Sequence, residues 1–167
     1  GFFKNNPRQD FEDLVIQKLP KIKNFELITK FLHTLDLPED FYERLVLKCA
    51  AEGTKSDFLT AIDAKCDENG KITNYSAQSY LANLVKDTSI LTTAIKSSNK
   101  EVTHYLMKHC TDLIQQLPFE HQVESTTAAF ETQQLGVLFD LLQRSDFPFP
   151  KDFKPKLITD KRILKVV

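Results

Sequence analysis

The sequence contains few of the residues on which non-helical folds depend. Only 4 of its 167 residues are glycine, and valine and isoleucine are too few to build a substantial β-sheet. The apolar residues recur instead mostly at spacings of three, four and five, which is typical of residues that share one face of a helix. We therefore predict an all-α fold.

Other absences bear on the compartment and on the larger context. Three cysteines, Cys49, Cys66 and Cys110, are odd in number and have no recognised spacing, so no disulfide framework is expected. No apolar run reaches the length that crosses a bilayer, and no N-terminal segment resembles a signal peptide. We expect an intracellular protein, cytoplasmic or nuclear, without a membrane contact. Because the chain begins at Gly1 rather than at a methionine, we also expect a monomeric fragment of a larger protein.

Motifs of enzymes and zinc sites are absent too. There is no G-x-S-x-G, no glycine-rich phosphate loop and no H-E-x-x-H, so no catalytic residue is predicted. His104, His109 and Cys110 are close in sequence, but five residues correspond to about 500° of helical rotation, which directs the two histidines to different faces. We expect them to pack or to cap a helix.

Residues 67–70, Asp-Glu-Asn-Gly, are similar to the centre of a calcium-binding loop. Lys65 and Ser76 occupy the places where such a loop needs its first and last carboxylates, so a surface turn is the better interpretation. We predict no metal site and no cofactor.

What the sequence does contain is a recurring pattern, in which an apolar residue is followed by an apolar residue four positions later and, in three of four cases, by another at the fifth position. Its first residues lie 31, 44 and 35 positions apart, and they are Leu27, Phe58, Val102 and Val137. A period of about 30 to 45 residues is typical of stacked helical repeats. We therefore predict a solenoid of helix pairs.

The apolar spacing and the helix-ending residues predict the individual helices. Thr54 with Asp57, and Ser98 with Glu101, are expected to form N-terminal caps. The expected ranges are residues 9–19, 25–35, 38–52, 55–64, 90–97, 99–109, 125–132 and 135–144. Residues 65–88 interrupt the array, either as an insertion or as a degenerate repeat, and contain an additional helix with Tyr80, Leu81, Leu84 and Val85 on its apolar face. Phe147 and Phe149, which alternate with prolines, either cover the last repeat or form an exposed contact.

The segment from Leu91 to Leu113 resembles an ankyrin repeat. Its L-x-x-A, turn, E-V and L-L positions are occupied by Leu91, Ala94, Ser98, Glu101, Val102, Leu106 and Met107. The same offsets recur in Leu47, Ala50, Phe58 and Ile62, and in Ala129, Val137, Leu141 and Leu142. The Thr-Pro-Leu-His tetrad and the glycines between repeats are missing, and the turn glycine survives only as Gly53. The chain thus resembles a divergent ankyrin array over residues 21–150, after an N-terminal capping helix in residues 1–20; other helical-pair solenoids stay open.

This resemblance implies a non-enzymatic adaptor or scaffold that binds a protein partner through its inner helices and the turns between repeats. Carried onto this chain, the contact positions are Lys96, Ser97, Glu131, Thr132 and Glu52. Ankyrin-like repeats of this kind imply no cofactor.

The last segment, residues 151–167, differs in charge from the rest. It holds six basic and two acidic residues within a chain of 22 basic and 23 acidic residues. The favoured interpretation is the solvated start of a truncated next repeat. The alternative is a regulatory fragment whose residues 154–165 contact nucleic acid, although the balanced charge of the whole chain makes nucleic acid the less expected partner.

Overall fold

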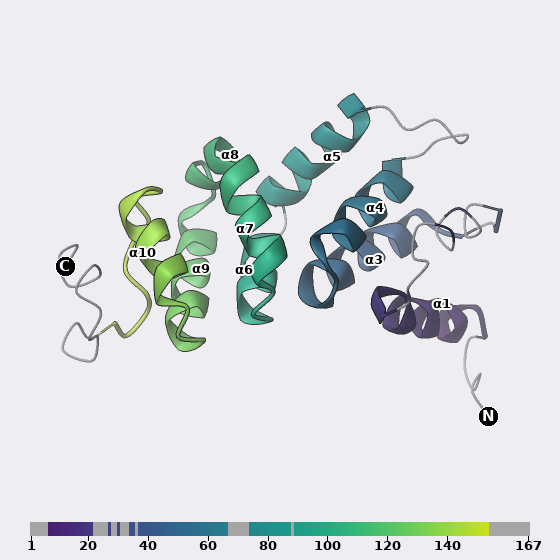
Figure 1. The fold of residues 1–167 in the computed structure, drawn as a ribbon, viewed down its shortest axis with the longest axis horizontal. Helices are drawn as coiled ribbons and strands as arrows, with labels where there is room; N and C mark the ends of the chain where they lie inside the picture. Colours follow the sequence, from purple (N-terminus) through teal and green to yellow (C-terminus); the bar gives the residue numbers. More distant parts are fainter. Residues whose placement is uncertain are drawn as a thin grey trace. The chain divides into compact units, whose positions relative to one another are not determined.

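The computed structural model describes residues 7–21, 27, 30, 34–35, 37–66, 74–87 and 89–153. Over these residues the chain forms nine α-helices and one 3-10 helix, with no strand (Figure 1). The prediction of an all-α protein is confirmed. The chain divides into two compact units, residues 1–81 and 82–167, and the division falls within helix α5 (Asn74–Asp87).

The first unit is built around the pair α3 (Glu39–Glu52) and α4 (Lys55–Cys66). The two helices pack against each other through fully buried side chains, among them Phe41, Leu45 and Phe58. At the turn between them the Thr54 hydroxyl accepts from the Asp57 amide at 3.0 Å, and the Asp57 carboxylate accepts from the Thr54 amide at 3.2 Å. This reciprocal capping box confirms the cap predicted there.

Helix α1 (Pro7–Lys18), with the 3-10 turn η1 (Leu19–Lys21), packs on α3. The Arg44 guanidinium donates to Glu12 and to Asp13, both at 2.8 Å. Glu12 is only 3% exposed, and a buried carboxylate needs such a partner to offset its lost hydration. Arg44 therefore fixes how α1 lies on α3.

The second unit contains the end of α5 and five further helices: α6 (Ile90–Lys96), α7 (Lys100–His109), α8 (Thr111–Gln115), α9 (Phe119–Glu131) and α10 (Leu135–Gln143). Helix α6 packs against both α7 and α9, and α9 packs against α10. Between α6 and α9 the hydroxyls of Thr92 and Ser125, both buried, share a hydrogen bond of 2.9 Å. This unit thus holds two helix pairs, joined through their first helices.

The turns of these two pairs share their backbone geometry. Ser98 and Gln133, 35 residues apart, have φ of 54° and 59°. The Ser98 and Asn99 amides donate to Ile95 and Ala94, and the Gln133 and Gln134 amides donate to Phe130 and Ala129 in the same order. This is the Schellman arrangement, in which a left-handed residue closes a helix and satisfies its last carbonyls.

The capping box predicted for Ser98 and Glu101 is wrong. Ser98 belongs to the end of α6, because its backbone is left-handed. Asn99 caps α7 instead, its side-chain oxygen accepting from the Val102 amide at 3.3 Å. The predicted cap was one residue too early.

Most predicted helices lie within a few residues of the observed ones, with two exceptions in the second unit. Helix α9 begins at Phe119 rather than at Ser125, and the short helix α8 was not predicted. Among the pattern's first residues, Phe58 and Val102 are fully buried, whereas Leu27 is 67% exposed. The helix predicted over residues 25–35 and the turn at residues 67–70 lie largely or wholly outside the described residues.

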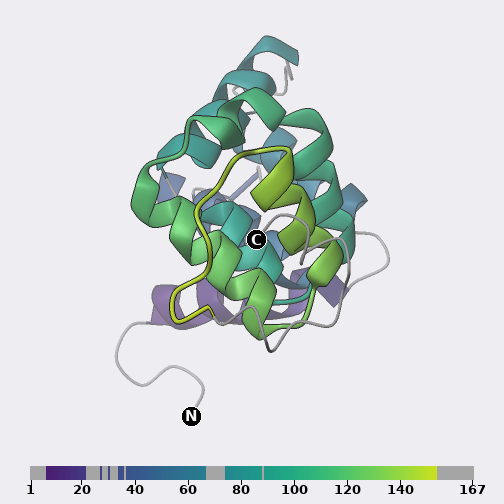
Figure 2. The same cartoon turned by 90° about the vertical axis from the view of Figure 1, so that its left-hand side faces the viewer.

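Beyond α10 the chain forms no helix up to residue 153 and runs along α9 (Figure 2). The Lys151 amide donates to the Thr127 hydroxyl at 3.0 Å, and the Phe153 ring meets the Phe130 ring edge-on at 5.5 Å. Phe147 is buried, whereas Phe149 is 41% exposed and stacks on Phe153. Phe147 therefore covers the last helix pair, and Phe149 is in part a surface residue.

Candidate partner-binding surface

The predicted contact residues Lys96 and Ser97 lie at the C-terminal end of α6. Lys96 is the last residue of the helix and Ser97 is its C-cap, and both side chains are exposed. The positive charge of Lys96 is placed favourably, because the C-terminal end of a helix carries partial negative charge. Within the described part of the chain Lys96 has no ion-pair partner.

Glu131 and Thr132 occupy the equivalent positions at the end of α9. Glu131 is exposed at a helix end whose last turn holds no basic residue, so its carboxylate faces the unfavourable end of the helix dipole. The half-buried Thr132 donates its hydroxyl to the Ala128 carbonyl at 2.6 Å and accepts from Gln134 Nε2 at 2.7 Å. The Thr132 hydroxyl therefore stabilises the turn. The methyl group of Thr132 remains for contact with a partner.

One side chain brings these two turns together. Gln134 Nε2 donates to the Ile95 carbonyl at 2.7 Å, which links the turn after α9 to the last residues of α6. Together with the packing of α6 on α9, this bond places the exposed ends of both helices on one surface. We call this surface, formed by Lys96, Ser97, Glu131 and Thr132, the turn surface.

Glu52, the remaining predicted contact residue, belongs to the first unit. It is the last residue of α3, is exposed, and pairs with Lys48 at 2.9 Å within the same helix. An exposed pair at this spacing contributes little to stability, so the Glu52 carboxylate stays accessible.

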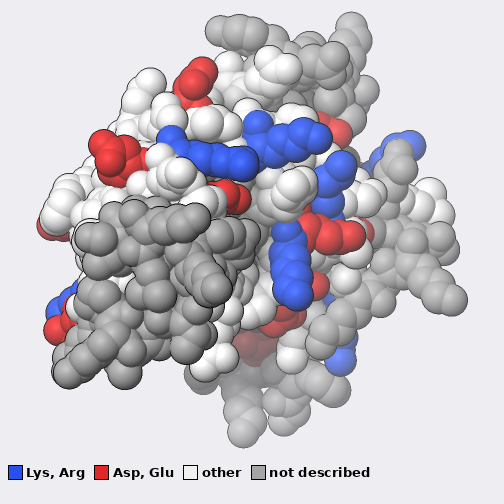
Figure 3. All heavy atoms as spheres, turned by 60° about the vertical axis from the view of Figure 1, so that its left-hand side comes forward, with Lys and Arg blue, Asp and Glu red and all other residues white. Residues whose placement is uncertain are grey.

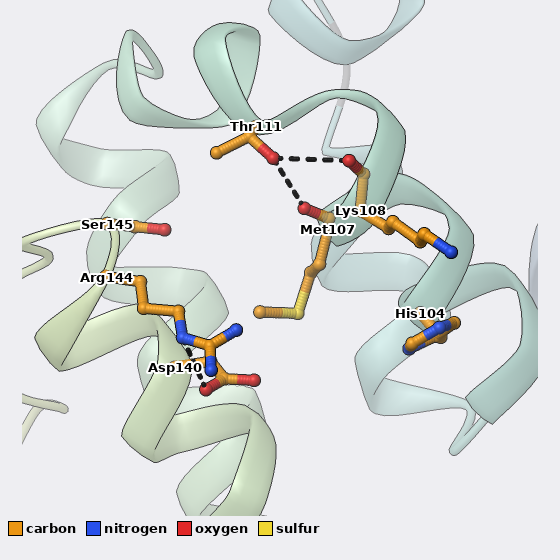
Figure 4. A pocket seen from close by; sticks show the side chains of 7 residues that line it. All are labelled: His104, Met107, Lys108, Thr111, Asp140, Arg144 and Ser145. Carbon is orange, nitrogen blue, oxygen red and sulfur yellow. Dashed lines mark hydrogen bonds and ion pairs between the residues drawn. The ribbon is translucent and has the colours of Figure 1, made fainter.

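A concavity in the second unit lies elsewhere, between the C-terminal ends of α7 and α10 (Figure 4). It has a volume of about 470 Å³ and is lined by His104, Met107, Lys108, Thr111, Asp140, Arg144 and Ser145. We call it the α7–α10 hollow. Met107 reaches into it from α7, while Asp140 and Arg144 border it from α10.

Basic and acidic side chains lie close together on the molecular surface. Figure 3 shows Lys and Arg side chains gathered in the upper middle of the view, with acidic ones among them. In the α7–α10 hollow, Lys108 and Arg144 carry full positive charge, and the one carboxylate, Asp140, lies 3.5 Å from the Arg144 Nε. The hollow therefore has a net positive charge.

The cysteine thiols that the structure describes, those of Cys49 and Cys110, are unreactive. Burial, with a smaller contribution from the Asp57 carboxylate, raises the pKa of Cys49 to about 12, and burial raises the pKa of Cys110 to about 11. A thiol with a raised pKa stays protonated and is a poor nucleophile and metal ligand. Within the described ranges, no three His, Cys, Asp or Glu side chains gather closely enough to hold a metal ion.

Over the residues that the structure describes, the chain is all-helical. No described helix is both long enough and apolar enough to span a bilayer. Comparisons with protein-family models, with curated proteins and with solved structures found no match. The basic stretch of residues 154–165 lies outside the described residues.

Sequence reasoning missed both Gln134 and the α7–α10 hollow. The hollow could have been suspected from the spacing of Lys100, His104 and Lys108, which places three basic or polar residues on one face of α7. Nothing in the sequence indicated that Arg144 would border the same hollow, because that depends on how the pairs α6–α7 and α9–α10 pack together.

Proposed function

We propose that this chain is a protein-interaction module of ankyrin-like helix pairs, and that the turn surface binds a protein partner. The observation that carries the proposal is the recurrence of one turn. The same hydrogen bonds and the same left-handed residue close the pairs α6–α7 and α9–α10, 35 residues apart. Repeated helix pairs with exposed turns are a common framework for protein recognition.

The residues of the turn surface support this role. Lys96 and Glu131 offer opposite charges from adjacent turns, and neither is used in an ion pair among the described residues. Glu131 also stands at a helix end that disfavours its charge. The position of this exposed carboxylate is not favoured by the helix dipole, which supports a role in binding.

A site-specific cross-linking experiment tests the proposal. A photoreactive amino acid at Ser97 is expected to trap a protein partner from lysate, also after nuclease treatment, whereas the same group at the exposed Glu124, on α9 and away from both the turn surface and the α7–α10 hollow, is not. The partner is then titrated against purified variants. Lys96→Glu and Glu131→Lys are each expected to weaken its binding by about tenfold, in line with a lost or reversed charge contact.

The matched controls are Lys86→Glu on α5 and Glu124→Lys on α9, which reverse exposed charges away from the turn surface. Unchanged affinity for Lys96→Glu and Glu131→Lys would refute the turn surface as the binding site. Recovery that depends on nucleic acid would instead favour the basic segment at residues 154–165.

A further inference from the structure

The α7–α10 hollow combines features that the fold does not require. Its volume of about 470 Å³ is in the range of ligand-binding sites. Its lining is contributed by two helix pairs, since His104, Met107 and Lys108 come from α7 whereas Asp140 comes from α10. The hollow is therefore shaped by the packing of one pair on the next.

The charged groups of the hollow are available to a ligand. Lys108 and His104 are exposed and have no ion-pair partner within the residues described. Arg144 is paired with Asp140 only through Nε at 3.5 Å, with its side chain 76% exposed. Because a guanidinium has five N–H donors, most of those of Arg144 remain open to a second acceptor.

The floor of the hollow is apolar. Met107 is half-buried, and its flexible, polarizable thioether adapts to the shape of an apolar group that contacts it. The Thr111 hydroxyl is not available as a donor to an anion, because it donates to the Met107 carbonyl at 2.8 Å and lies 3.4 Å from the Lys108 carbonyl. A ligand thus meets positive charge at the rim and an apolar surface beneath.

We propose that the α7–α10 hollow binds an acidic peptide segment of a partner protein. One Asp or Glu carboxylate of the peptide lies between Lys108 and Arg144, and a neighbouring apolar side chain contacts Met107. A bidentate carboxylate fits the open face of the Arg144 guanidinium.

The chemistry of the hollow favours a carboxylate peptide over other anions. The side chain next to a peptide carboxylate can contact the apolar surface of Met107, which is part of the lining, whereas inorganic phosphate cannot. Nucleic acids are bound through many phosphate contacts and through aromatic side chains on which bases stack. The lining supplies two full cations, and its one aromatic ring is the imidazole of His104.

This site is separate from the turn surface. Lys108 and Arg144 are near the C-terminal ends of α7 and α10, whereas Lys96 and Glu131 end α6 and α9. Its existence does not depend on the proposed function, and either surface could be disabled without the other.

Met107 makes a direct test possible, because it is the single methionine of the chain. In protein labelled with 13C at the methionine methyl group, one signal reports on the floor of the hollow. The probe is a hexapeptide of alternating glutamate and leucine, and its counterpart carries glutamine in place of glutamate. We expect the methyl signal to shift saturably as the acidic peptide is added. The glutamine peptide is expected to bind with about tenfold lower affinity, since the carboxylate contacts are charge-assisted.

Variants then show which residues bind. Lys108→Gln and Arg144→Gln are each expected to weaken the affinity for the acidic peptide by about fivefold. Lys100→Gln, on the same helix but outside the hollow, is expected to change this affinity less than twofold. Both positions are exposed, and an unchanged far-UV circular dichroism spectrum shows that each variant folds. The proposal is overturned if the methyl signal does not respond, if both peptides shift it equally, or if only inorganic phosphate or a DNA duplex shifts it.

Discussion

The turn between α3 and α4 and the turns of the second unit join helix pairs with the same apolar spacing, but they end the first helix differently. After α6 and α9 a left-handed residue, Ser98 or Gln133, closes a Schellman motif. After α3, Gly53 has φ of −90°, and the capping box of Thr54 and Asp57 begins the next helix directly. Similar helix pairs thus require different turn chemistry.

The comparison also shows why glycine occurs where it does. Gly53 does not have a left-handed backbone; an added Cβ at this position would lie 3.0 Å from the Cys49 carbonyl oxygen, a tight contact that glycine avoids. Ser98 and Gln133 adopt the left-handed backbone that glycine favours, yet neither is glycine. In the turn of the first unit, glycine leaves room for the neighbouring backbone. In the turns of the second unit, Ser98 and Gln133 adopt a left-handed backbone that is strained for any residue with a Cβ.

The largest expected effect follows from Gly53→Ala. The new methyl group meets backbone atoms of Cys49 that cannot move independently, so we expect the free energy of unfolding to fall by about 2 kcal/mol. Urea denaturation followed by circular dichroism measures it. The control is Gly136→Ala in α10, where nothing lies within 4 Å of the new Cβ; there we expect a gain of about 0.5 kcal/mol. Equal effects at both positions would contradict the steric explanation.

Gln134→Ala tests the bond that links the two turns of the second unit. It removes the hydrogen bonds to the Ile95 carbonyl and to Thr132, and we expect a loss of about 1.5 kcal/mol in the free energy of unfolding. At the equivalent place in the other turn, Asn99→Ala removes the side-chain cap of α7 and is expected to cost about 1 kcal/mol. Gln143→Ala, at an exposed site, serves as the control. If Gln134→Ala left the free energy of unfolding unchanged, helix packing alone would align the two turns.

Ser98→Gly and Gln133→Gly should relieve the strain of the left-handed turns. We expect each to raise the free energy of unfolding by about 0.7 kcal/mol, as glycine adopts this backbone without a Cβ penalty. Ser97→Gly is the matched control, because Ser97 has φ of −82° and gains nothing from glycine. If Ser97→Gly stabilised the protein as much as Ser98→Gly, the turn geometry would not be the cause.

The smallest expected effect is a pH dependence of the α3–α4 pair. Burial, then Asp57, raises the pKa of Cys49 from its ordinary value of 9.0 to about 12. Because only the unfolded thiol ionises in that range, the contribution of the buried thiol to the free energy of unfolding is complete well below pH 9 and is lost progressively as the pH rises through 9 toward 12.

The stability difference between the parent protein and Cys49→Ala should accordingly narrow by about 0.4 kcal/mol from pH 7 to pH 9. Urea denaturation of both proteins at each pH measures this difference. The equivalent residue of α6 is Thr93, which does not titrate, so Thr93→Ala should show no such change. A difference that stays constant or widens for Cys49→Ala would contradict the raised pKa.

Helix positions were predictable where apolar periodicity and a helix-ending residue agree. Leu91, Ala94, Val102 and Leu106 are all buried as predicted, because their spacing alone defines one face of each helix. The start of α9 was missed because His121, Gln122 and Glu124 obscure the pattern in its first turns. The cap at Asn99 was misplaced because two neighbouring polar residues, Ser98 and Asn99, both favour helix starts.

The candidate surfaces were less predictable than the helices. The resemblance to ankyrin repeats suggested Lys96 and Glu131, and the structure places both on exposed helix ends; their role in binding stays a prediction. The α7–α10 hollow depends on the distance between side chains 36 residues apart, Lys108 and Arg144. Sequence spacing within one helix carries no information about such a pair.

The buried hydrogen bond between Thr92 and Ser125 has a consequence for how α6 and α9 recognise each other. Both helices pack against each other and bury small apolar residues, among them Ala94 and Ala129, and apolar packing of this kind would tolerate a shift of one helix along the other. Such a shift would separate the two hydroxyls and leave each without a partner in the core, at a cost of about 1 to 3 kcal/mol per group. The two hydroxyls therefore select one alignment of the helices among several that hydrophobic packing alone would accept.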